Sequence, residues 1–356
     1  MKAKRRLTLL FISGREIGYI RNRVLLAALR AHHDVTILTP RLSGTSERIA
    51  AGLTRFLLRP PTYDVVFAGF YGQPLALALS RLQRKPIVLD AFVSTYDTLC
   101  EDRRRFAPNS LAGRLAFWLD AESCRGARRV LTDTAADAAY LRDTFDVPEV
   151  KLTPMYVGCD ETLFFPRPAS AKTGGCTVFY YGAFLPLHGV DVILRAAEKL
   201  KHLPAVRFII GGAGPGLSQM QQLAAELMLR NVDFIGWIPI DRLPAHIADA
   251  DICLGGHFST VPKAARVIAT KTFQFVAMGK PTIVGENAAT RELFVPGEDV
   301  LAVPMGDPET LANMVRVLAE DTALRAYIAA GGRARFEAHA ATAIIAQQLA
   351  ELIGGL

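Results

Sequence analysis

The sequence has few cysteines, and their spacing excludes two kinds of site. Five cysteines lie far apart in 356 residues, and no two of them form a C-x-x-C pair. An odd number of scattered cysteines argues against a disulfide framework, and the missing pair argues against a zinc site. We therefore expect a protein of the reducing cytoplasm.

Long hydrophobic runs are also missing. No segment approaches the ~18 uncharged apolar residues of a membrane-spanning helix. The basic start, MKAKRRLTLLFISGREIGYI, has no long apolar stretch followed by a small-residue cleavage site. The sequence therefore predicts neither a membrane span nor export.

Acidic residues are outnumbered by basic ones. The chain has 41 Lys and Arg against 34 Asp and Glu, a net charge of +7. This balance indicates an anionic partner, which could be a phosphorylated metabolite, a nucleic acid or an acidic membrane face. Nucleic acid is the least favoured of these, because no recognised binding module is present and the arginines are scattered.

One basic stretch, EDRRRFAPNSLAGRLAFWLD, combines charge with the aromatic residues Phe106, Phe117 and Trp118. Its arginines are Arg103, Arg104, Arg105 and Arg114. This combination would suit contact with anionic lipid and the presentation of a lipid-linked acceptor. A solvated loop beside a packed helix explains the same residues.

Apolar residues are abundant. The chain is 51% hydrophobic and 21% charged, and it is too long for one compact core, so two domains are expected. We place an N-terminal domain at 1–163, a linker rich in Pro and Gly at 164–175, and a C-terminal domain at 176–356. The last helix could pack back on the first domain.

Both halves alternate apolar runs with amphipathic stretches. The first half opens with RLTLLFIS, YIRNRVLLAALRAH and DVTILTP, and the second with CTVFYYGAF, VDVILRAAEKL and VRFIIGGAG. Unbroken apolar strands are typical of a parallel sheet that helices cover on both faces. We predict an α/β fold of two doubly wound, Rossmann-like domains, with ligands bound outside the carboxyl ends of the strands, in the cleft between the domains.

The dinucleotide-binding glycine fingerprint is absent. The first turn, ISGREIG, places Gly14 and Gly18 where a tight bend and a close ligand are possible, but it is not G-x-G-x-x-G. The second strand ends in Thr39 and Pro40, where a nicotinamide enzyme should have an acidic residue. Both observations argue against an oxidoreductase, and the turn alone would also explain Gly14.

Two turns of the second half could hold phosphate. In YYGAFLPLHGVDVIL, Gly182 ends a strand and His188 precedes a helix, whose first N–H groups suit an anion. His188 could add a hydrogen bond or a positive charge, or it could be an ordinary polar cap. IIGGAGPG, which contains Gly214, follows another strand and is a weak signal by itself.

The stretch KTFQFVAMGKP predicts a short apolar helix that ends at Gly279. The positive charge of Lys271 in the first turn is unfavourable beside the positive end of the helix dipole unless an anion lies there. Lys271 therefore indicates a site for a diphosphate, and a solvated lysine is the alternative. Gln274 among apolar residues needs partners, which could be sugar or ribose hydroxyls or the backbone.

These segments together resemble the retaining glycosyltransferase family 4, which has the GT-B fold, over nearly the whole chain. VGCDETLFFP resembles its interdomain stretch, VFYYGAFLPLHGVDVILRAAEKL its second-domain opening, and KTFQFVAMGKPTIV its signature helix. NVDFIGWIPIDRLPAHIADADICL, which contains Trp237, resembles the segment that brings the nucleotide base to the backbone.

The sequence departs from this family at four positions. The family commonly has G-R-L-x-x-x-K-G, with Arg and Lys on the donor diphosphate, where this chain has Ala183 and His188. The family's two glutamates, eight residues apart, are replaced by Arg266 and Gln274. Gln274 can still hydrogen-bond to a ribose, and Arg266 could bring positive charge near the phosphates.

The resemblance implies transfer of a sugar from a nucleotide-diphosphate donor to a hydroxyl of a saccharide or lipid-linked glycan. It implies retention, no metal ion or other cofactor, and a cytoplasmic enzyme of envelope polysaccharide synthesis with peripheral contact at the inner membrane. The catalytic candidates are His188, Lys271 and Asp90. The donor-binding candidates are Gly14, Gly182, Ala183, Phe184, Gly214, Trp237, Arg266, Thr272 and Gln274.

Two questions stay open at this point. Asp90, in VLDAFVSTYDT, could orient an acceptor hydroxyl in the N-terminal domain, or it could cap a helix. The departures from the family pattern also allow a non-catalytic GT-B protein that binds a nucleotide sugar or supports an active partner.

Overall fold

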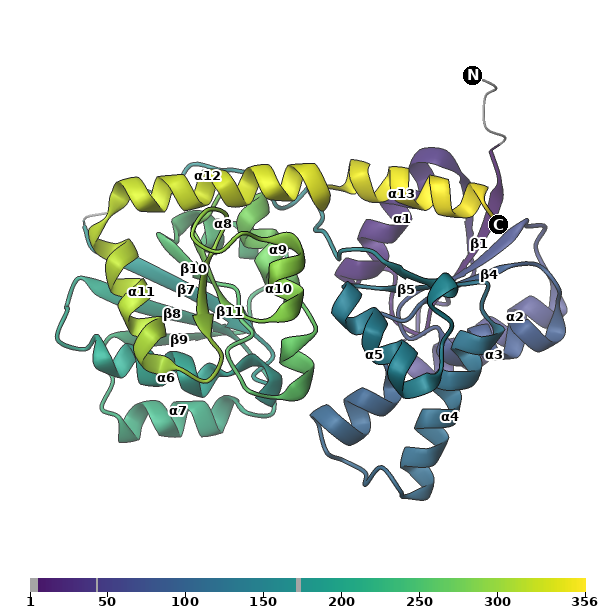
Figure 1. Ribbon diagram of the computed structural model, residues 1–356, viewed down its shortest axis with the longest axis horizontal. Coiled ribbons are helices and arrows are strands. Elements are labelled where there is room, and N and C mark those ends of the chain that lie inside the picture. Colours follow the sequence, from purple (N-terminus) through teal and green to yellow (C-terminus); the bar gives the residue numbers. More distant parts are fainter. Residues whose placement is uncertain (1–5, 43, 171–173) are drawn as a thin grey trace. The chain divides into compact units, whose positions relative to one another are not determined.

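The chain folds into two α/β units, each with one parallel sheet (Figure 1). The structure, a computed structural model, describes residues 6–42, 44–170 and 174–356. The chain up to Gly158, together with Ala341–Leu356, forms the first unit, and Cys159–Ala340 forms the second. The sequence predicts borders at 163 and 176, and residues 171–173 of the expected linker lie outside the described part.

The first unit contains a six-stranded sheet in the order β2-β1-β3-β4-β5-β6, with parallel neighbours throughout. Its strands are β1 (Thr8–Ile12), β2 (Asp34–Ile37), β3 (Val65–Ala68), β4 (Ile87–Asp90), β5 (Arg129–Thr132) and β6 (Leu152–Pro154). Its helices are α1 (Ile20–His32), α2 (Thr45–Leu58), α3 (Gln73–Leu82), α4 (Leu111–Gly126), α5 (Ala135–Phe145) and α13 (Thr342–Gly354), with a π-helical turn at Asp97–Asp102 and a 3-10 turn at Glu149–Lys151.

Both faces of this sheet are buried, because successive side chains of a strand point to opposite faces. Leu10 and Ile12 of β1 pack in a core shared with α2, α3, α4 and α5. Leu9 and Phe11 pack in a second core shared with α1 and α13. The unbroken apolar runs in the sequence are explained by this two-sided burial, and the doubly wound arrangement is confirmed.

The last helix of the chain belongs to the first unit. α13 lies against α1 and buries Ile345, Leu349 and Ile353 in the core next to Leu25 (Figure 1). Among the residues described, no helix combines the length and the apolar character needed to cross a bilayer.

The second unit contains a six-stranded parallel sheet in the order β12-β11-β10-β7-β8-β9. Its strands are β7 (Cys176–Gly182), β8 (Val206–Gly212), β9 (Val232–Gly236), β10 (Ile252–Leu254), β11 (Thr282–Glu286) and β12 (Leu301–Pro304). Its helices are α6 (Val190–Lys199), α7 (Leu217–Glu226), α8 (Leu243–Asp249), α9 (Thr270–Ala277), α10 (Ala288–Leu293), α11 (Pro308–Glu320) and α12 (Thr322–His339), with 3-10 turns at Pro186–His188 and Pro262–Ala265.

The strand order of the second unit places a topological switch at β7. β8, the next strand of the unit along the chain, pairs with one edge of β7, and β10 pairs with the other. The connections from β7 and β10 therefore leave the sheet side by side, and in open parallel sheets this is where a ligand binds. α9 follows β10 along the chain and stops before Gly279, whose φ of +65° is a helix end typical of glycine.

Candidate functional site

The candidate site lies at the carboxyl ends of β7 and β10 in the second unit. His188 ends the 3-10 turn that follows β7, and His257 follows β10. Lys271 and Thr272 are in the first turn of α9. Because β7 and β10 are neighbours in the sheet, residues about 70 positions apart in the chain, His188 and His257, come together.

The two histidines stack. Their ring centroids are 5.5 Å apart and the rings are inclined by 16°. The Tyr180 ring meets the His188 ring edge-on at 6.5 Å, and the Lys271 ammonium lies over the Tyr180 ring, 5.0 Å from its centroid. Aromatic rings and one cation thus form a compact group from β7, the two connecting loops and α9.

Several polar atoms of this group are buried without a partner. Neither Nδ1 of His188 nor Nδ1 of His257 makes a hydrogen bond within the described chain, and the same holds for the Tyr180 hydroxyl and the Thr272 hydroxyl. Buried polar groups in native proteins are nearly always hydrogen-bonded, because desolvation without a bond is costly. Four unsatisfied groups from neighbouring elements therefore indicate a site that a polar ligand completes.

Gly182 explains why there is room beside these atoms. A Cβ at this position would lie 2.6 Å from the Tyr180 hydroxyl oxygen and 2.9 Å from Nδ1 of His188. Both distances are too short for a carbon contact, so any larger residue would have to displace the Tyr180 and His188 side chains. Gly214 has a different reason to be glycine, since it has a φ of +156° and its Cβ would lie 1.7 Å from the carbonyl oxygen of Ala183.

Burial controls the electrostatics of the site. It lowers the pKa of the Lys271 amine to about 7. Burial, followed by the nearby Lys271 charge and then His257, lowers the pKa of His188. Burial, then Lys271 and Lys263, holds the pKa of His257 well below its usual value. The ring nitrogens are consequently neutral near pH 7, and an entering anion would favour protonation of all three groups.

Comparison with known proteins shows which family this chain resembles. Residues 193–351 match a family model described as glycosyl transferase-like. The D-inositol 3-phosphate glycosyltransferase of Nocardioides sp. is 26% identical over 222 residues, which are 57% of this chain and 48% of that protein. The lipopolysaccharide core biosynthesis glycosyltransferase LpsD of Rhizobium meliloti is 30% identical over 166 residues, 45% of each protein. The chain is a relative of the group 1 glycosyltransferases. It spans about half the length of these curated relatives.

Solved structures show the fold of this glycosyltransferase relative. HepE from Anabaena, determined with UDP and glucose, has a TM-score of 0.75 at 19% identity and covers 99% of this chain and 100% of its own. Sucrose-phosphate synthase from Thermosynechococcus elongatus has a TM-score of 0.74 at 16% identity and covers 98% of this chain and 98% of its own. The GT-B fold with two Rossmann-like domains, expected from the sequence, is confirmed.

Gln274 occupies the position of a family glutamate and is fully buried. The Tyr181 hydroxyl donates a hydrogen bond to Oε1 of Gln274, while Nε2 has no partner within the described chain. The amide thus bonds to a side chain of β7, whereas the sequence suggests a sugar or ribose hydroxyl or the backbone as its partner. Contact with a ribose would need Gln274 to become accessible, and this role stays a prediction.

The other donor-binding candidates of the second unit lie round the ends of β7, β8 and β9. Ala183 is exposed just beyond β7, and Phe184, with a φ of +50°, is buried against Phe234 with the ring centroids 6.3 Å apart. Trp237 follows the edge strand β9 and is 70% exposed. Arg266 caps the 3-10 turn before α9 and is half-buried. Their contacts with a donor stay predictions.

Asp90 of the first unit is placed differently from expectation. It ends β4 and is fully buried, and Arg21 donates to it from Nη2 at 2.9 Å and from Nε at 3.3 Å to each carboxylate oxygen. Nη1 of Arg21 bonds to the carbonyl oxygens of Met155 and Tyr156 at 3.1 and 3.0 Å. This internal ion pair uses both oxygens, and Asp90 is the N-cap of none of the described helices. Its role toward an acceptor hydroxyl stays a prediction.

Gly14, also in the first unit, is explained by packing. A Cβ there would lie 2.3 Å from the carbonyl oxygen of Tyr71. This close approach requires glycine with no ligand present, which supports the turn-only alternative.

Sequence reasoning missed His257 and Tyr180. His257, in CLGGHFST, follows β10 directly, as His188 follows β7 after a short loop, so its place at a strand end was the available signal. Tyr180 gave no signal, because an aromatic residue within a strand is ordinary core. Within the described residues, no three His, Cys, Asp or Glu side chains gather as metal ligands, and metal independence stays a prediction.

Proposed function

We propose that this protein transfers a sugar from a nucleotide-diphosphate donor to a hydroxyl acceptor, with retention at the anomeric carbon and without a metal ion. The observation that carries the proposal is the set of unsatisfied polar groups at the carboxyl ends of β7 and β10, with the Lys271 amine beside them. These groups lie at the topological switch of a GT-B second domain. A diphosphate bound there would find N–H, O–H and cationic partners.

Glycosyl transfer from such a donor requires stabilisation of the departing diphosphate. Negative charge grows on its oxygens as the glycosyl bond breaks, and preorganised donors in a water-poor site lower the barrier most. Lys271 would supply positive charge, and the Thr272 hydroxyl and the His188 ring would supply hydrogen bonds. Arg266, four residues before α9, is the further cation expected near the phosphates.

Lys271 can meet the phosphate oxygens only if its amine is charged. Burial lowers its pKa to about 7, so near neutral pH the amine is close to half protonated before the donor binds. The anion itself would then shift the amine to the charged form. The site could therefore stay nearly uncharged while empty and become cationic around the diphosphate.

The donor and acceptor classes follow from the relatives. HepE was solved with UDP and with UDP-glucose, and one curated relative is a GDP-mannose-dependent mannosyltransferase of Mycolicibacterium smegmatis. We propose a uridine or guanosine diphosphate sugar as donor. LpsD and the WcaL colanic acid protein of Salmonella typhimurium support a saccharide or lipid-linked glycan of the cell envelope as acceptor, reached from the cytoplasm.

A non-catalytic GT-B protein is the second candidate. Ala183 and His188 stand where the family commonly has Arg and Lys, and Gln274 is buried against Tyr181. These features would weaken turnover more than binding. Such a protein would bind a nucleotide sugar or support an active partner.

Calorimetry followed by donor hydrolysis separates these functions. The purified chain is titrated with UDP, GDP, NAD, uridine and guanosine, and then incubated with the sugar nucleotide of whichever diphosphate binds. Binding with hydrolysis or transfer supports the enzyme, and binding without turnover supports the second candidate. Tight NAD binding without diphosphate binding would overturn both.

Lys271→Ala tests the phosphate assignment. We expect the diphosphate to bind at least about tenfold more weakly, because a charge-assisted hydrogen bond is lost. Nucleoside binding should change little. Lys201→Ala, at an exposed lysine of the same unit, is the control. Equal losses for diphosphate and nucleoside would remove Lys271 from the phosphate site.

A further inference from the structure

One edge of the first unit exposes apolar and cationic side chains together. Seven large apolar residues between positions 55 and 128 are exposed, including Leu58 at 76%, Leu111 at 85% and Trp118 at 44%. The other four are Leu57, Leu82, Leu115 and Phe117. Soluble proteins rarely gather so many exposed apolar residues in one region without a binding role.

The exposed charges of this region have one sign. Eleven Lys and Arg residues between positions 55 and 128 are exposed, whereas every Asp and Glu in that range is buried or half-buried. The exposed cations are Arg55, Arg59, Arg81, Arg84, Lys85, Arg103, Arg104, Arg105, Arg114, Arg125 and Arg128. The exposed charges of this region are therefore all positive, although its buried and half-buried carboxylates reduce its net charge.

These residues form a connected surface, which we call the α2–α4 face. The Arg81 guanidinium at the end of α3 lies 5.7 Å from the centre of the Trp118 ring on α4, and α3 packs along α4. α2 in turn contacts α3. The face thus comprises the C-terminal turns of α2 and α3, the outer side of α4, and the arginines that precede α4.

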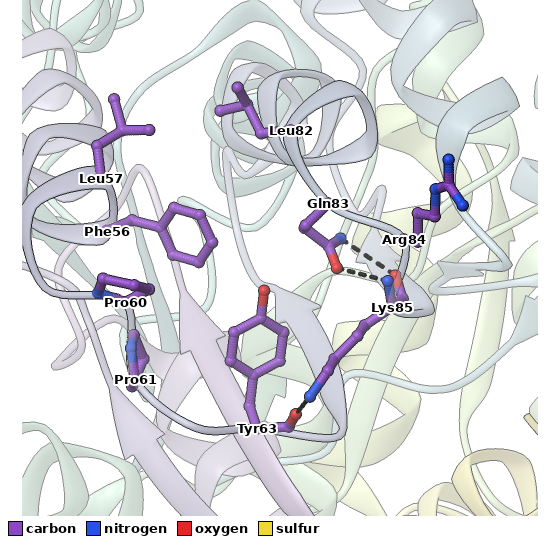
Figure 2. Close-up of a pocket in the computed structure, with 9 residues that line it drawn as sticks. All are labelled: Phe56, Leu57, Pro60, Pro61, Tyr63, Leu82, Gln83, Arg84 and Lys85. Carbon is purple, nitrogen blue, oxygen red and sulfur yellow. Dashed lines mark hydrogen bonds between the residues drawn. The ribbon is translucent and has the colours of Figure 1, made fainter.

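A recess lies between the ends of α2 and α3 (Figure 2). Its volume is about 580 Å³, and its walls are mainly apolar side chains, with Arg84 and Lys85 at one side. Figure 2 shows Phe56 and Tyr63 pointing into the recess, and Leu57 and Leu82 at its upper side. The Lys85 ammonium bonds back to the carbonyl oxygen of Tyr63, which holds it beside this recess.

α4 presents its apolar side chains outward. Leu111, Leu115 and Trp118 have the i, i+4, i+7 spacing of one helix side and are all exposed. The buried side of α4 carries small residues such as Gly113 and Ala116. An apolar stripe on the solvent side of a helix indicates that something other than the protein's own core covers it.

We propose that the α2–α4 face binds the surface of an anionic lipid bilayer. Exposed leucines and a tryptophan would enter the interfacial region, while the arginines would meet lipid phosphates. A continuous negative surface matches a face without exposed carboxylates, whereas protein partners mostly present mixed charge. Nucleic acid would leave the leucines without a role. This inference does not depend on glycosyl transfer, although a lipid-linked acceptor would be brought to the protein in this way.

Vesicle binding tests the proposal with the full chain. We expect the protein to sediment with vesicles of phosphatidylcholine and phosphatidylglycerol, and not with phosphatidylcholine alone. The double variant Leu58→Glu/Leu111→Glu should reduce sedimentation about tenfold or more. The matched control is Met228→Glu/Tyr327→Glu, which alters two exposed apolar residues of the second unit and should bind as the unchanged protein does.

Tryptophan fluorescence locates the contact, because Trp118 and Trp237 are the two tryptophans of the chain. In Trp237→Phe, emission from Trp118 should shift to the blue with anionic vesicles and be quenched by brominated lipid. In Trp118→Phe, emission from Trp237 should not change. Absence of binding to anionic vesicles would overturn the proposal. So would binding that the double variant leaves unchanged and that does not shift the emission of Trp118.

Two further measurements separate the possible outcomes. Retention on an acidic protein or on DNA, with no vesicle binding, would also overturn the membrane assignment. Calorimetry with the diphosphate on the two double variants should give unchanged affinity, because Leu58, Leu111, Met228 and Tyr327 lie outside the candidate site. If Leu58→Glu/Leu111→Glu loses lipid binding and still binds the nucleotide, the result supports the α2–α4 face as the lipid-binding surface. If the unchanged protein binds vesicles but no nucleotide, only the proposed function is contradicted.

Discussion

At the scale of single residues, Lys271 links ligand binding to pH. Its amine is buried, no carboxylate pairs with it in the described chain, and burial lowers its pKa to about 7. A bound diphosphate would raise that pKa, so binding above about pH 7 should take up a proton. We expect the affinity for UDP or GDP to fall about tenfold per pH unit well above pH 7. Calorimetry over this range, in two buffers of different ionisation enthalpy, measures both the affinity and the proton uptake.

Lys271→Met is the control for this pH dependence. The variant should bind the diphosphate weakly and with little change above pH 7. The unfolded chain, with an ordinary lysine pKa, binds more protons than the folded chain between about pH 7 and about pH 10, so the buried amine lowers stability at neutral pH. The variant should therefore be more stable at pH 7. Affinity independent of pH in the unchanged protein would contradict the role of Lys271.

His257 is the second residue whose role can be tested alone. Its buried Nδ1 has no partner, and its ring stacks on His188 beside Lys271. We expect His257→Phe, which keeps the ring but has no donor, to weaken diphosphate binding about tenfold while nucleoside affinity stays nearly unchanged, since a hydrogen bond to a charged group contributes about 1.5–3 kcal/mol. His202→Phe, at an exposed histidine of the same unit, should have no effect. A purely structural His257 would lower the thermal midpoint of the variant and affect both ligands alike.

At the scale of elements, the end of β7 determines whether the site can accept a ligand. The methyl group of Gly182→Ala would meet the Tyr180 hydroxyl and Nδ1 of His188 at 2.6 and 2.9 Å. We expect the variant to fold, because both contacts are to side chains, and to lose most diphosphate affinity. Gly18→Ala is the matched control, since nothing lies within 4 Å of its new methyl group. Unchanged affinity in the Gly182 variant would place the ligand elsewhere.

The elements also show which parts of the site a sequence can predict. The turn after β7 and the first turn of α9 are local patterns, and His188 and Lys271 were found from them. His257 needed the strand order, because only the pairing of β10 with β7 brings it to His188. The partner of Asp90 is Arg21, 69 residues away, and the partner of Gln274 is Tyr181, 93 residues away. No local pattern predicts such pairs.

At the scale of the whole molecule, the alternation of apolar runs was enough to predict two parallel sheets. Strands buried on both faces leave a strong signal, and both six-stranded sheets confirm it. The unit to which the final helix belongs could not be read in this way, because an apolar helix fits either core. The structure assigns α13 to the first unit through its packing on α1.

Two buried side chains test this assignment. Leu349 on α13 lies in a core of the first unit, and Ile328 on α12 lies in the core of the second; both are fully buried. Replacing either by Ala should cost about 2–5 kcal/mol of unfolding free energy, because each leaves a cavity. Hydrogen exchange measured by mass spectrometry shows where stability is lost. Leu349→Ala should speed exchange in α1 and β1, and Ile328→Ala should speed it in α11 and β12. Slow exchange in α1 with fast exchange in α12 after Leu349→Ala would mean that α13 stabilises the second unit instead.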